Sequence, residues 1–74
     1  MPYPNIYLVK DLARITGHSV HTIKYYLKIG LIKEISRSPE TGYRYFDNST
    51  VERVNIIRSF RKAGKSIKEI DGLL

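Results

Sequence analysis

The sequence contains no cysteine and no tryptophan, and only one methionine in 74 residues. Without cysteine, the chain cannot form a disulfide framework, a zinc finger, an iron–sulfur cluster or a thiol sensor. Acidic residues are also scarce, because seven of them stand against 13 lysines and arginines, and the net charge is +6 with neutral histidine. This excess of positive charge favours an anionic partner such as nucleic acid, a membrane surface or an acidic protein.

Long apolar runs are missing as well, since no stretch approaches the roughly 20 apolar residues that span a bilayer. The start of the chain, an irregular segment over residues 1–6 with two prolines, lacks the basic and apolar regions of a signal peptide. We therefore expect a cytoplasmic protein, with residues 1–74 forming a single domain. So short a chain does not easily form a deep catalytic cleft.

Catalytic and metal-binding patterns are not found either. No paired carboxylates and no Ser-His-Asp order occur, so we expect no enzyme. His18 and His21 lie three residues apart, but no third ligand is near them in the sequence, so we expect no metal and no cofactor.

The first half of the chain has the pattern of two short helices. Helical spacing of apolar residues predicts a helix over 9–16, which begins after the poor N-cap Leu8 and ends at Gly17. Ser19 is a good N-cap for a second helix over 20–29. Two helices joined by a three-residue turn indicate a helix-turn-helix.

The middle of the chain has the pattern of a β-hairpin. Residues 31–35 and 43–46 are strand-prone, and the segment 36–42 between them is rich in turn-forming and basic residues. We expect two short strands with a basic tip.

Two capping boxes predict the last two helices. Ser49 and Glu52 would open a third helix that continues to about Ala63, and Ser66 and Glu69 would open a fourth that reaches the end of the chain. The order is helix, helix, hairpin, helix, helix. This order is a mainly α fold with a small β-hairpin, a winged helix-turn-helix. The predicted core comprises Val9, Leu12, Ala13, Val20, Ile23, Tyr26, Leu31, Val51, Val54, Ile57, Phe60, Ile67 and Ile70.

The second helix of a helix-turn-helix fits the major groove of double-stranded DNA. On its outer face, polar side chains could reach base edges and cationic ones could neutralise phosphates, while the two hairpin arginines could contact the backbone. The candidate residues for these contacts are Ser19, His21, Thr22, Lys24, Tyr25, Lys28, Arg37 and Arg44.

Residues 7–74 resemble the DNA-binding domain of the MerR family of bacterial transcriptional regulators. The resemblance rests on an ordered series of motifs: Leu12-Ala13-x-x-Thr16-Gly17, Ser19-Val20-x-Thr22-Ile23-Lys24-Tyr25-Tyr26, Ile29-Gly30-Leu31-Ile32, Gly42-Tyr43-Arg44-x-Phe46 and Gly64-x-Ser66-Ile67-x-Glu69-Ile70. It implies that Lys10, Tyr43, Arg61 and Lys65 also contact DNA. The sequence departs from the family pattern at Lys24, where arginine is usual, and at Lys65, where an aromatic residue is usual.

The resemblance also implies what the whole protein does. MerR-family members bind pseudo-palindromic promoters as dimers and distort the DNA so that RNA polymerase can engage it, which places them at the bacterial nucleoid. A long dimerisation helix and an effector domain carry out pairing and sensing. The 74 residues contain neither, and we expect a domain trimmed from a longer regulator, monomeric when isolated.

Two other functions remain open. An excisionase-like protein that bends DNA uses a similar small winged fold. Residues 50–65 form a basic amphipathic pattern, which also suits a membrane surface or a partner protein.

Several residues have a simpler structural interpretation. Tyr26 lies on the apolar stripe and is expected in the core, whereas Tyr25 lies off it and is expected to face DNA. His21 is as well explained by an ordinary exposed position as by a base contact. Arg53, Arg58 and Lys62 are expected to form a solvated helix face.

Overall fold

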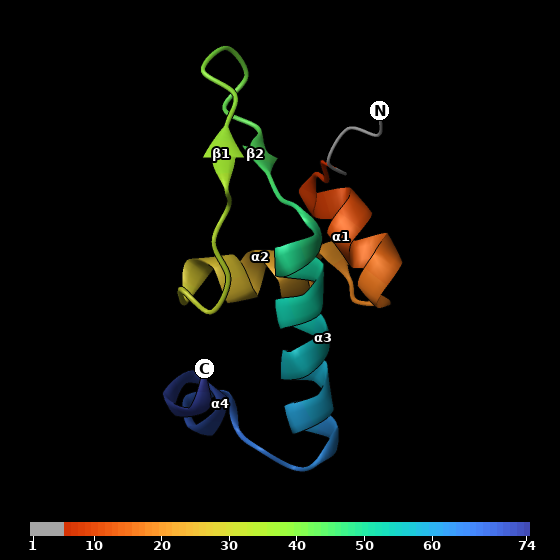
Figure 1. The fold of residues 1–74 in the computed structure, drawn as a ribbon, viewed down its shortest axis with the longest axis vertical. Helices are drawn as coiled ribbons and strands as arrows, with labels where there is room; N and C mark the ends of the chain where they lie inside the picture. The colour runs from red at the N-terminus through yellow and green to blue at the C-terminus, as the bar shows by residue number, and fades with distance from the viewer. Residues whose placement is uncertain (1–5) are drawn as a thin grey trace.

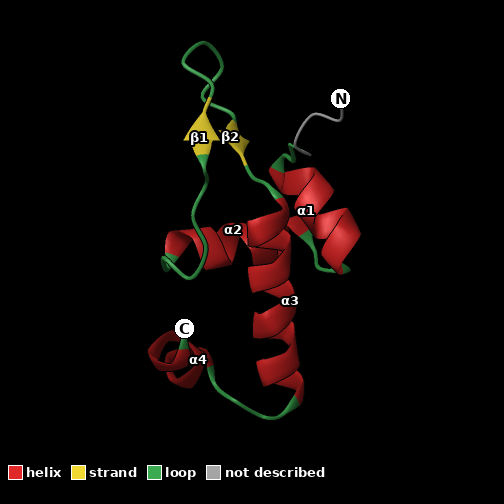
Figure 2. Cartoon of the chain, in the orientation of Figure 1, coloured by secondary structure: helices red, strands yellow, loops and turns green. Residues whose placement is uncertain are grey.

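A computed structural model describes residues 6–74. Four helices and one two-stranded antiparallel sheet make up this part of the chain (Figures 1 and 2). The elements are α1 (Val9–Thr16), α2 (Val20–Lys28), β1 (Ser36–Arg37), β2 (Arg44–Tyr45), α3 (Asn48–Lys62) and α4 (Ile67–Leu73). The predicted order and fold class are confirmed. The irregular segment expected over 1–6 falls, apart from Ile6, outside the described residues.

The long α3 forms the spine of the molecule, whose extents are 38 × 26 × 20 Å. In Figure 1, α2 crosses behind the upper half of α3, α1 lies beside it, and the hairpin projects beyond both at one end. The turn after α3 carries α4 to the other end. Within residues 6–74, no helix is both long and apolar enough to cross a membrane.

One hydrophobic core joins all four helices to the segments around the hairpin. Leu12, Ile23, Val54, Ile57 and Ile70 are completely buried in it, as their spacing predicts. Val9, Val51, Phe60 and Ile67 are partly buried and pack against these residues.

The predicted core needs two kinds of correction. Val20 was expected inside, but 40% of it is exposed, because the first turn of α2 lies at the surface. Ile32 and Phe46 were not expected in the core, yet 2% and 0% of them are exposed. Ile32 lies in an irregular segment and Phe46 in an isolated bridge to Tyr7, and neither is long enough for a periodic pattern to show which residues are buried.

The hairpin is shorter and lies further along the chain than predicted. Ser36 pairs with Tyr45 and Arg37 with Arg44, so the first strand does not include residues 31–35. Instead, the N–H groups of Leu31 and Ile32 donate to the Tyr26 carbonyl, at 2.9 and 3.4 Å. This connection turns the chain directly beneath α2, and both side chains are buried in the core.

The N-cap of helix α3 lies two residues before the predicted one, at Asp47 instead of Ser49. Asp47 is the N-cap, and its Oδ1 accepts hydrogen bonds from the N–H and the hydroxyl of Ser49, at 3.0 and 2.5 Å. The hydrogen bonds from Ser49 hold the pKa of the Asp47 carboxyl below its usual value. The predicted box of Ser49 and Glu52 is therefore wrong. The predicted box of Ser66 and Glu69 is confirmed by reciprocal bonds of 3.0 and 3.2 Å.

A single carboxylate makes up for the poor N-cap of α1. Leu8 cannot accept a hydrogen bond through its side chain, but its N–H donates to Oδ2 of Asp11 at 2.9 Å. One of the otherwise unpaired donors at the helix start is satisfied in this way.

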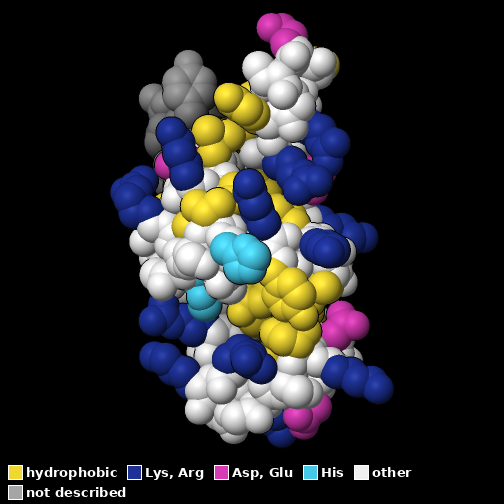
Figure 3. Space-filling view, turned by 180° about the vertical axis from the view of Figure 1, so that it is seen from behind, with side chains coloured by type: hydrophobic (Ala, Val, Ile, Leu, Met, Phe, Trp, Pro, Cys, Tyr) yellow, Lys and Arg dark blue, Asp and Glu magenta, His cyan; other side chains and the backbone are white. Residues whose placement is uncertain are grey.

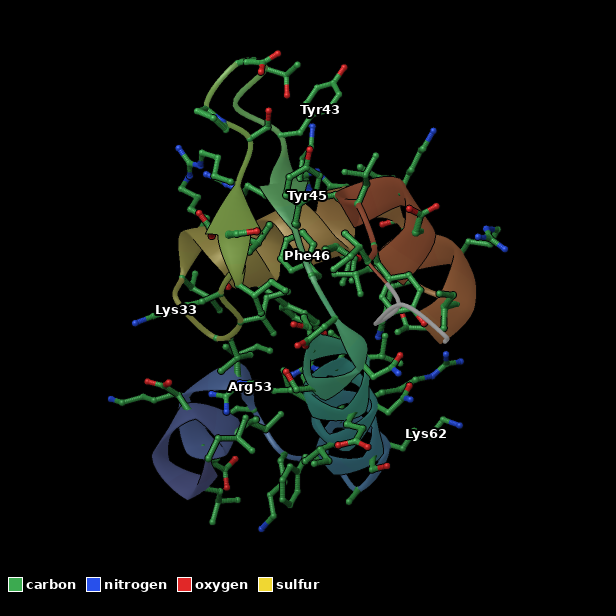
Figure 4. All side chains as sticks on the ribbon, turned by 45° about the horizontal axis from the view of Figure 1, so that its top comes forward. Lys33, Tyr43, Tyr45, Phe46, Arg53 and Lys62 are labelled. Carbon is green, nitrogen blue, oxygen red and sulfur yellow. The ribbon has the colours of Figure 1, made fainter. Side chains whose placement is uncertain are left out.

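Two arginines of α3 were expected in solvent, but each donates a hydrogen bond to a backbone carbonyl of another segment. Nε of Arg53 donates to the Leu31 carbonyl at 2.6 Å, and Nη1 of Arg58 donates to the Thr16 carbonyl at the end of α1. Both side chains are half-buried, whereas Lys62 is exposed as predicted. Figure 4 shows Arg53 reaching inward from α3 and Lys62 pointing away from the molecule. Their charge is used to satisfy carbonyl groups that no helix or sheet pairs.

Replacing Gly17 with alanine is expected to destabilise the domain by about 2–4 kcal/mol. Gly17 has φ +74°, a conformation that costs a residue with a Cβ about 1–2 kcal/mol. The new Cβ would also lie 2.7 Å from Nη1 of Arg58, so the hydrogen bond from Arg58 to Thr16 would break, at a cost of about 1–2 kcal/mol. Urea denaturation followed by circular dichroism measures the loss.

The matched control for Gly17 is Gly64→Ala. Gly64 has φ +88°, and a Cβ placed there would meet nothing within 4 Å, so only the backbone cost applies. Equal losses of unfolding free energy in the two variants would contradict a stabilising role for the Arg58 contact.

Candidate nucleic-acid interface

The outer face of α2 is a continuous exposed stripe. Its side chains recur at alternating steps of one and three residues, which places them on one side of the helix, opposite the buried Ile23 and Tyr26. The stripe consists of Val20, His21, Lys24, Tyr25 and Lys28. Tyr25 is 46% exposed and Tyr26 only 4%, as predicted for this pair. The helix thus presents apolar, aromatic and cationic groups together.

Ser19 and Thr22 hold the start of this helix. The Ser19 hydroxyl oxygen accepts the N–H of Thr22 at 3.1 Å, and the two hydroxyl oxygens lie 3.0 Å apart, in hydrogen-bonding distance. Thr22 is half-buried. Both hydroxyls are therefore engaged with each other, and the side chains that extend outward from the first turn are those of Val20 and His21.

On one side of the stripe, α2 meets the start of α1 and the second strand in an open groove of about 390 Å³. Three cations from three different elements lie around it, and between them the surface is mostly apolar. We call it the basic groove; it contains Lys10, Lys24 and Arg44, with Val9, Val20 and Tyr43 between them. Tyr43 is 59% exposed beside the hairpin. Figure 4 shows Tyr43 further out on the hairpin than Phe46, which points into the core.

On the other side of the stripe, α2 faces the end of α3 and the start of α4. This second hollow, the histidine hollow, is lined by His21, Thr22, Tyr25, Tyr26, Arg61 and Ile67. Arg61 also donates through Nη1 to the Lys65 carbonyl at 3.3 Å, a contact across the α3–α4 turn. A cation from the C-terminal half of the chain therefore lies beside the outer face of α2.

Glu34 lies between the two hairpin arginines. Its Oε2 is 2.9 Å from Nη2 of Arg37 and 3.7 Å from Nε of Arg44. A hydrogen bond from its own backbone, followed by that from Arg37, holds the pKa of the Glu34 carboxyl below its usual value. One carboxylate therefore lies between two guanidinium groups and partly neutralises both of them.

Some predicted contact residues are exposed without lining either hollow. Lys28 lies one helical turn after Lys24 on α2, Arg37 lies on β1, and Lys65 lies in the turn before α4. The structure thus brings Lys10, Lys24, Tyr43 and Arg44 together in one group, and His21, Thr22, Tyr25 and Arg61 in another.

His18, in the turn before α2, has a structural position. Its ring meets the ring of Tyr26 edge-on, with centroids 5.8 Å apart, and its Nε2 is buried without a hydrogen-bond partner. Burial lowers the pKa of the His18 imidazole, and the charge of Arg58 lowers it further. Across residues 6–74, no three histidine, cysteine or acidic side chains gather in a way that could hold a metal ion.

Figure 3 shows the molecule from behind, the side on which α2 lies. Lysine and arginine side chains in dark blue surround yellow apolar patches on this face, and histidine in cyan lies among them. Acidic side chains in magenta lie at the edges and at the hairpin tip. This face is therefore mainly positively charged, and lysine and arginine side chains surround its apolar patches.

A family model described as "MerR HTH family regulatory protein" matches residues 7–74. The chain belongs to the MerR family. It is 39% identical over 66 residues to the mercuric resistance operon regulatory protein of Bacillus cereus, a match covering 89% of this chain and 49% of that protein. It is also 39% identical over 66 residues to a probable heavy metal-dependent transcriptional regulator of Haemophilus influenzae, covering 89% and 51%. This MerR-family chain spans about half the length of these curated relatives.

Solved structures of MerR-family regulators have the same fold. A MerR-family transcriptional regulator from Bacillus cereus superposes with a TM-score of 0.86 at 26% identity, covering 93% of this chain and 51% of that one. HiNmlR, described as a MerR-family regulator lacking the sensor domain and bound to promoter DNA, gives a TM-score of 0.82 at 25% identity, covering 93% and 52%. These relatives are transcriptional regulators, so the excisionase-like alternative is not favoured.

Sequence reasoning missed the exposure of Val20, a residue of the basic groove. Val20 was assigned to the core because it follows the apolar stripe of α2, yet it lies in the basic groove. The available signal was its place as the first residue after the Ser19 N-cap, since a first helical turn commonly lies at the surface of a helix-turn-helix.

Proposed function

We propose that this MerR-family domain binds double-stranded promoter DNA and is the DNA-reading part of a transcriptional regulator. The observation that carries the proposal is the exposed stripe of α2, with cations from α1, the hairpin and α3 on both sides of it. A helix with cationic flanks on each side fits a major groove, whose two edges are rows of phosphates.

Each predicted contact residue has a role in this arrangement. In the proposed complex α2 lies in the major groove, where His21 and Tyr25 face base edges or the nearest phosphates. The cations on either side neutralise the backbone, while the N-terminus of α2 at Ser19 faces a phosphate. The proposed phosphate contacts are Lys10, Lys24, Lys28, Arg37, Tyr43, Arg44, Arg61 and Lys65. Thr22 acts mainly through Ser19, because their hydroxyls are bonded to each other.

The finer parts of the proposal concern the assembly. Residues 7–74 act as one DNA-binding domain that contacts a half-site, and two copies in a homodimer read a pseudo-palindrome. Distortion of the bound promoter then changes how RNA polymerase engages it, at the bacterial nucleoid. The family match and the promoter-bound relative support this proposal. Nothing in the chemistry of the site requires a cofactor or catalysis.

The affinity of the 74-residue chain for duplex DNA is expected to fall steeply with salt. If Lys10, Lys24, Lys28, Arg37, Arg44, Arg61 and Lys65 each neutralise one phosphate, the log–log slope of the binding constant against salt concentration is about −6.3, at roughly −0.9 per phosphate. Fluorescence anisotropy with a labelled duplex, at salt concentrations between about 50 and 200 mM, measures this slope.

The control for this titration is a vesicle-binding assay with anionic and neutral lipids. Co-sedimentation with anionic vesicles in the absence of any duplex binding would contradict the proposed function and favour the membrane-surface alternative. A slope near zero would contradict phosphate contacts by the cationic flanks of α2.

A further inference from the structure

Val20 is an exposed β-branched residue at the start of the helix proposed to enter DNA. It is 40% exposed, although the rest of the apolar pattern of α2 is turned inward at Ile23 and Tyr26. Around Val20, the basic groove continues the apolar surface to Val9 and Tyr43. The surface offered to the partner is therefore an apolar patch of several side chains, which is more informative than a single exposed apolar residue.

The surroundings of Val20 restrict the chemistry of that partner. Lys24 lies one turn further along α2, and Lys10 and Arg44 complete the cationic edge of the basic groove. A ligand that fits must present a small apolar group a short distance from negative charges. In the major groove of DNA, the C5-methyl group of thymine is the apolar group, and phosphates border it on both sides.

The hydrogen-bonding groups of the same helical turn point to the same ligand. The Ser19 and Thr22 hydroxyl oxygens are 3.0 Å apart, so one of their two O–H groups is used between them and only the other remains to donate to a ligand. The outward side chains of the first turn are those of Val20 and His21, and the N-terminal residues of a recognition helix are the ones that reach base edges.

We propose that Val20 is a specificity-determining residue, and that the basic groove recognises the C5-methyl group of a thymine next to the phosphates that Lys10, Lys24 and Arg44 neutralise. The inference rests on the proposed function. The inference goes beyond the proposed function because it names the base that is selected and the side chain of α2 that selects it.

The test begins with a duplex selected from a random pool by the 74-residue chain. Each thymine of the selected site is then replaced, one at a time, by deoxyuridine, which removes the methyl group and leaves base pairing intact. Loss of one methyl contact is expected to weaken binding about 3- to 5-fold, measured by anisotropy at constant salt. One thymine of the half-site should show this loss, and the other thymines should show little.

The Val20→Ala variant identifies the side chain responsible. It should bind the thymine and deoxyuridine forms of that site equally, while the overall salt slope stays unchanged. Ile56→Ala is the matched control, because Ile56 is 46% exposed on α3 and outside the basic groove; it should keep the 3- to 5-fold preference. Circular dichroism of both variants checks that they fold.

The outcomes separate the inference from the proposed function. A chain that binds duplex DNA with no methyl-dependent thymine, or with a methyl effect that persists in Val20→Ala, would overturn the inference alone. A chain that selects no duplex would overturn the proposed function and the inference with it.

Discussion

Replacing Phe46 with alanine is expected to lower the thermal midpoint of the domain by about 12–40 °C. Phe46 is completely buried and is the largest fully buried side chain among residues 6–74. Truncating such a phenylalanine costs about 3–5 kcal/mol, through lost burial and the cavity left behind. A domain of this size has only about 4–11 kcal/mol of total stability, and each kcal/mol moves its midpoint by about 4–8 °C.

The position of Phe46 explains why one residue matters so much. Its N–H donates to the Tyr7 carbonyl and its carbonyl accepts from the Tyr7 N–H, both at 2.8 Å, so its backbone ties the N-terminal segment to the hairpin. Its side chain meanwhile fills the core between the hairpin and the helices (Figure 4). Loss of the side chain therefore loosens the support of the basic groove as well as the core.

The matched control for Phe46→Ala is Tyr43→Ala. Both changes truncate an aromatic residue next to the second strand, but Tyr43 is 59% exposed and should change stability by about 0.5 kcal/mol or less. Calorimetry or circular dichroism melting measures both. Similar thermal midpoints for the two variants would mean that the buried Phe46 side chain does not stabilise the core more than the exposed Tyr43 side chain does.

Removing the three cations of the basic groove is expected to weaken DNA binding on the order of 100-fold. If each of Lys10, Lys24 and Arg44 contributes about 1 kcal/mol through its phosphate, the triple alanine variant loses about 3 kcal/mol, or roughly two decades in affinity. The log–log salt slope should become less steep by about 2.7. All duplex sequences should be affected nearly equally, because phosphates carry no base information.

The control variant removes the same charge from other places. Arg14, Lys33 and Lys62 are exposed and line neither the basic groove nor the histidine hollow. Their triple replacement by alanine lowers the net charge equally, so it should slow association slightly and leave most of the salt slope intact. If both triple variants lost affinity to the same extent, net charge alone would account for binding and the proposed groove contacts would be wrong.

The regular elements could be predicted because their signals are local. The helix at 9–16 and the helix predicted over 20–29, which ends one residue earlier at Lys28, follow from apolar spacing and from the caps Ser19 and Gly17. The last helix follows from the box of Ser66 and Glu69. Charge and motif order were also sufficient to indicate a MerR-family domain, which the family match confirms.

The errors at Arg53 and Arg58 concern side chains whose state depends on contacts far along the chain. Nothing near Arg58 in sequence shows that it reaches the Thr16 carbonyl, 42 residues away, and Arg53 contacts Leu31 across 22 residues. A charged side chain on a helix is normally solvated, so local reasoning assigned both to solvent. The assignment of Leu31 to a strand has a different cause. Strand propensity does not reveal that the Leu31 N–H donates to the Tyr26 carbonyl at the end of α2.

The sequence by itself determined the kind of molecule: a small basic helix-turn-helix with a hairpin, whose recognition helix carries cations and an aromatic residue on one side. Only the tertiary structure decided which of these groups meet. It placed Lys10, Lys24 and Arg44 in one groove and Arg61 beside His21, and it moved Val20 from the expected core to the surface. The physical reason is that helical periodicity reports which residues share a face, whereas the packing of α1, α3 and the hairpin around α2 determines which part of that face is covered.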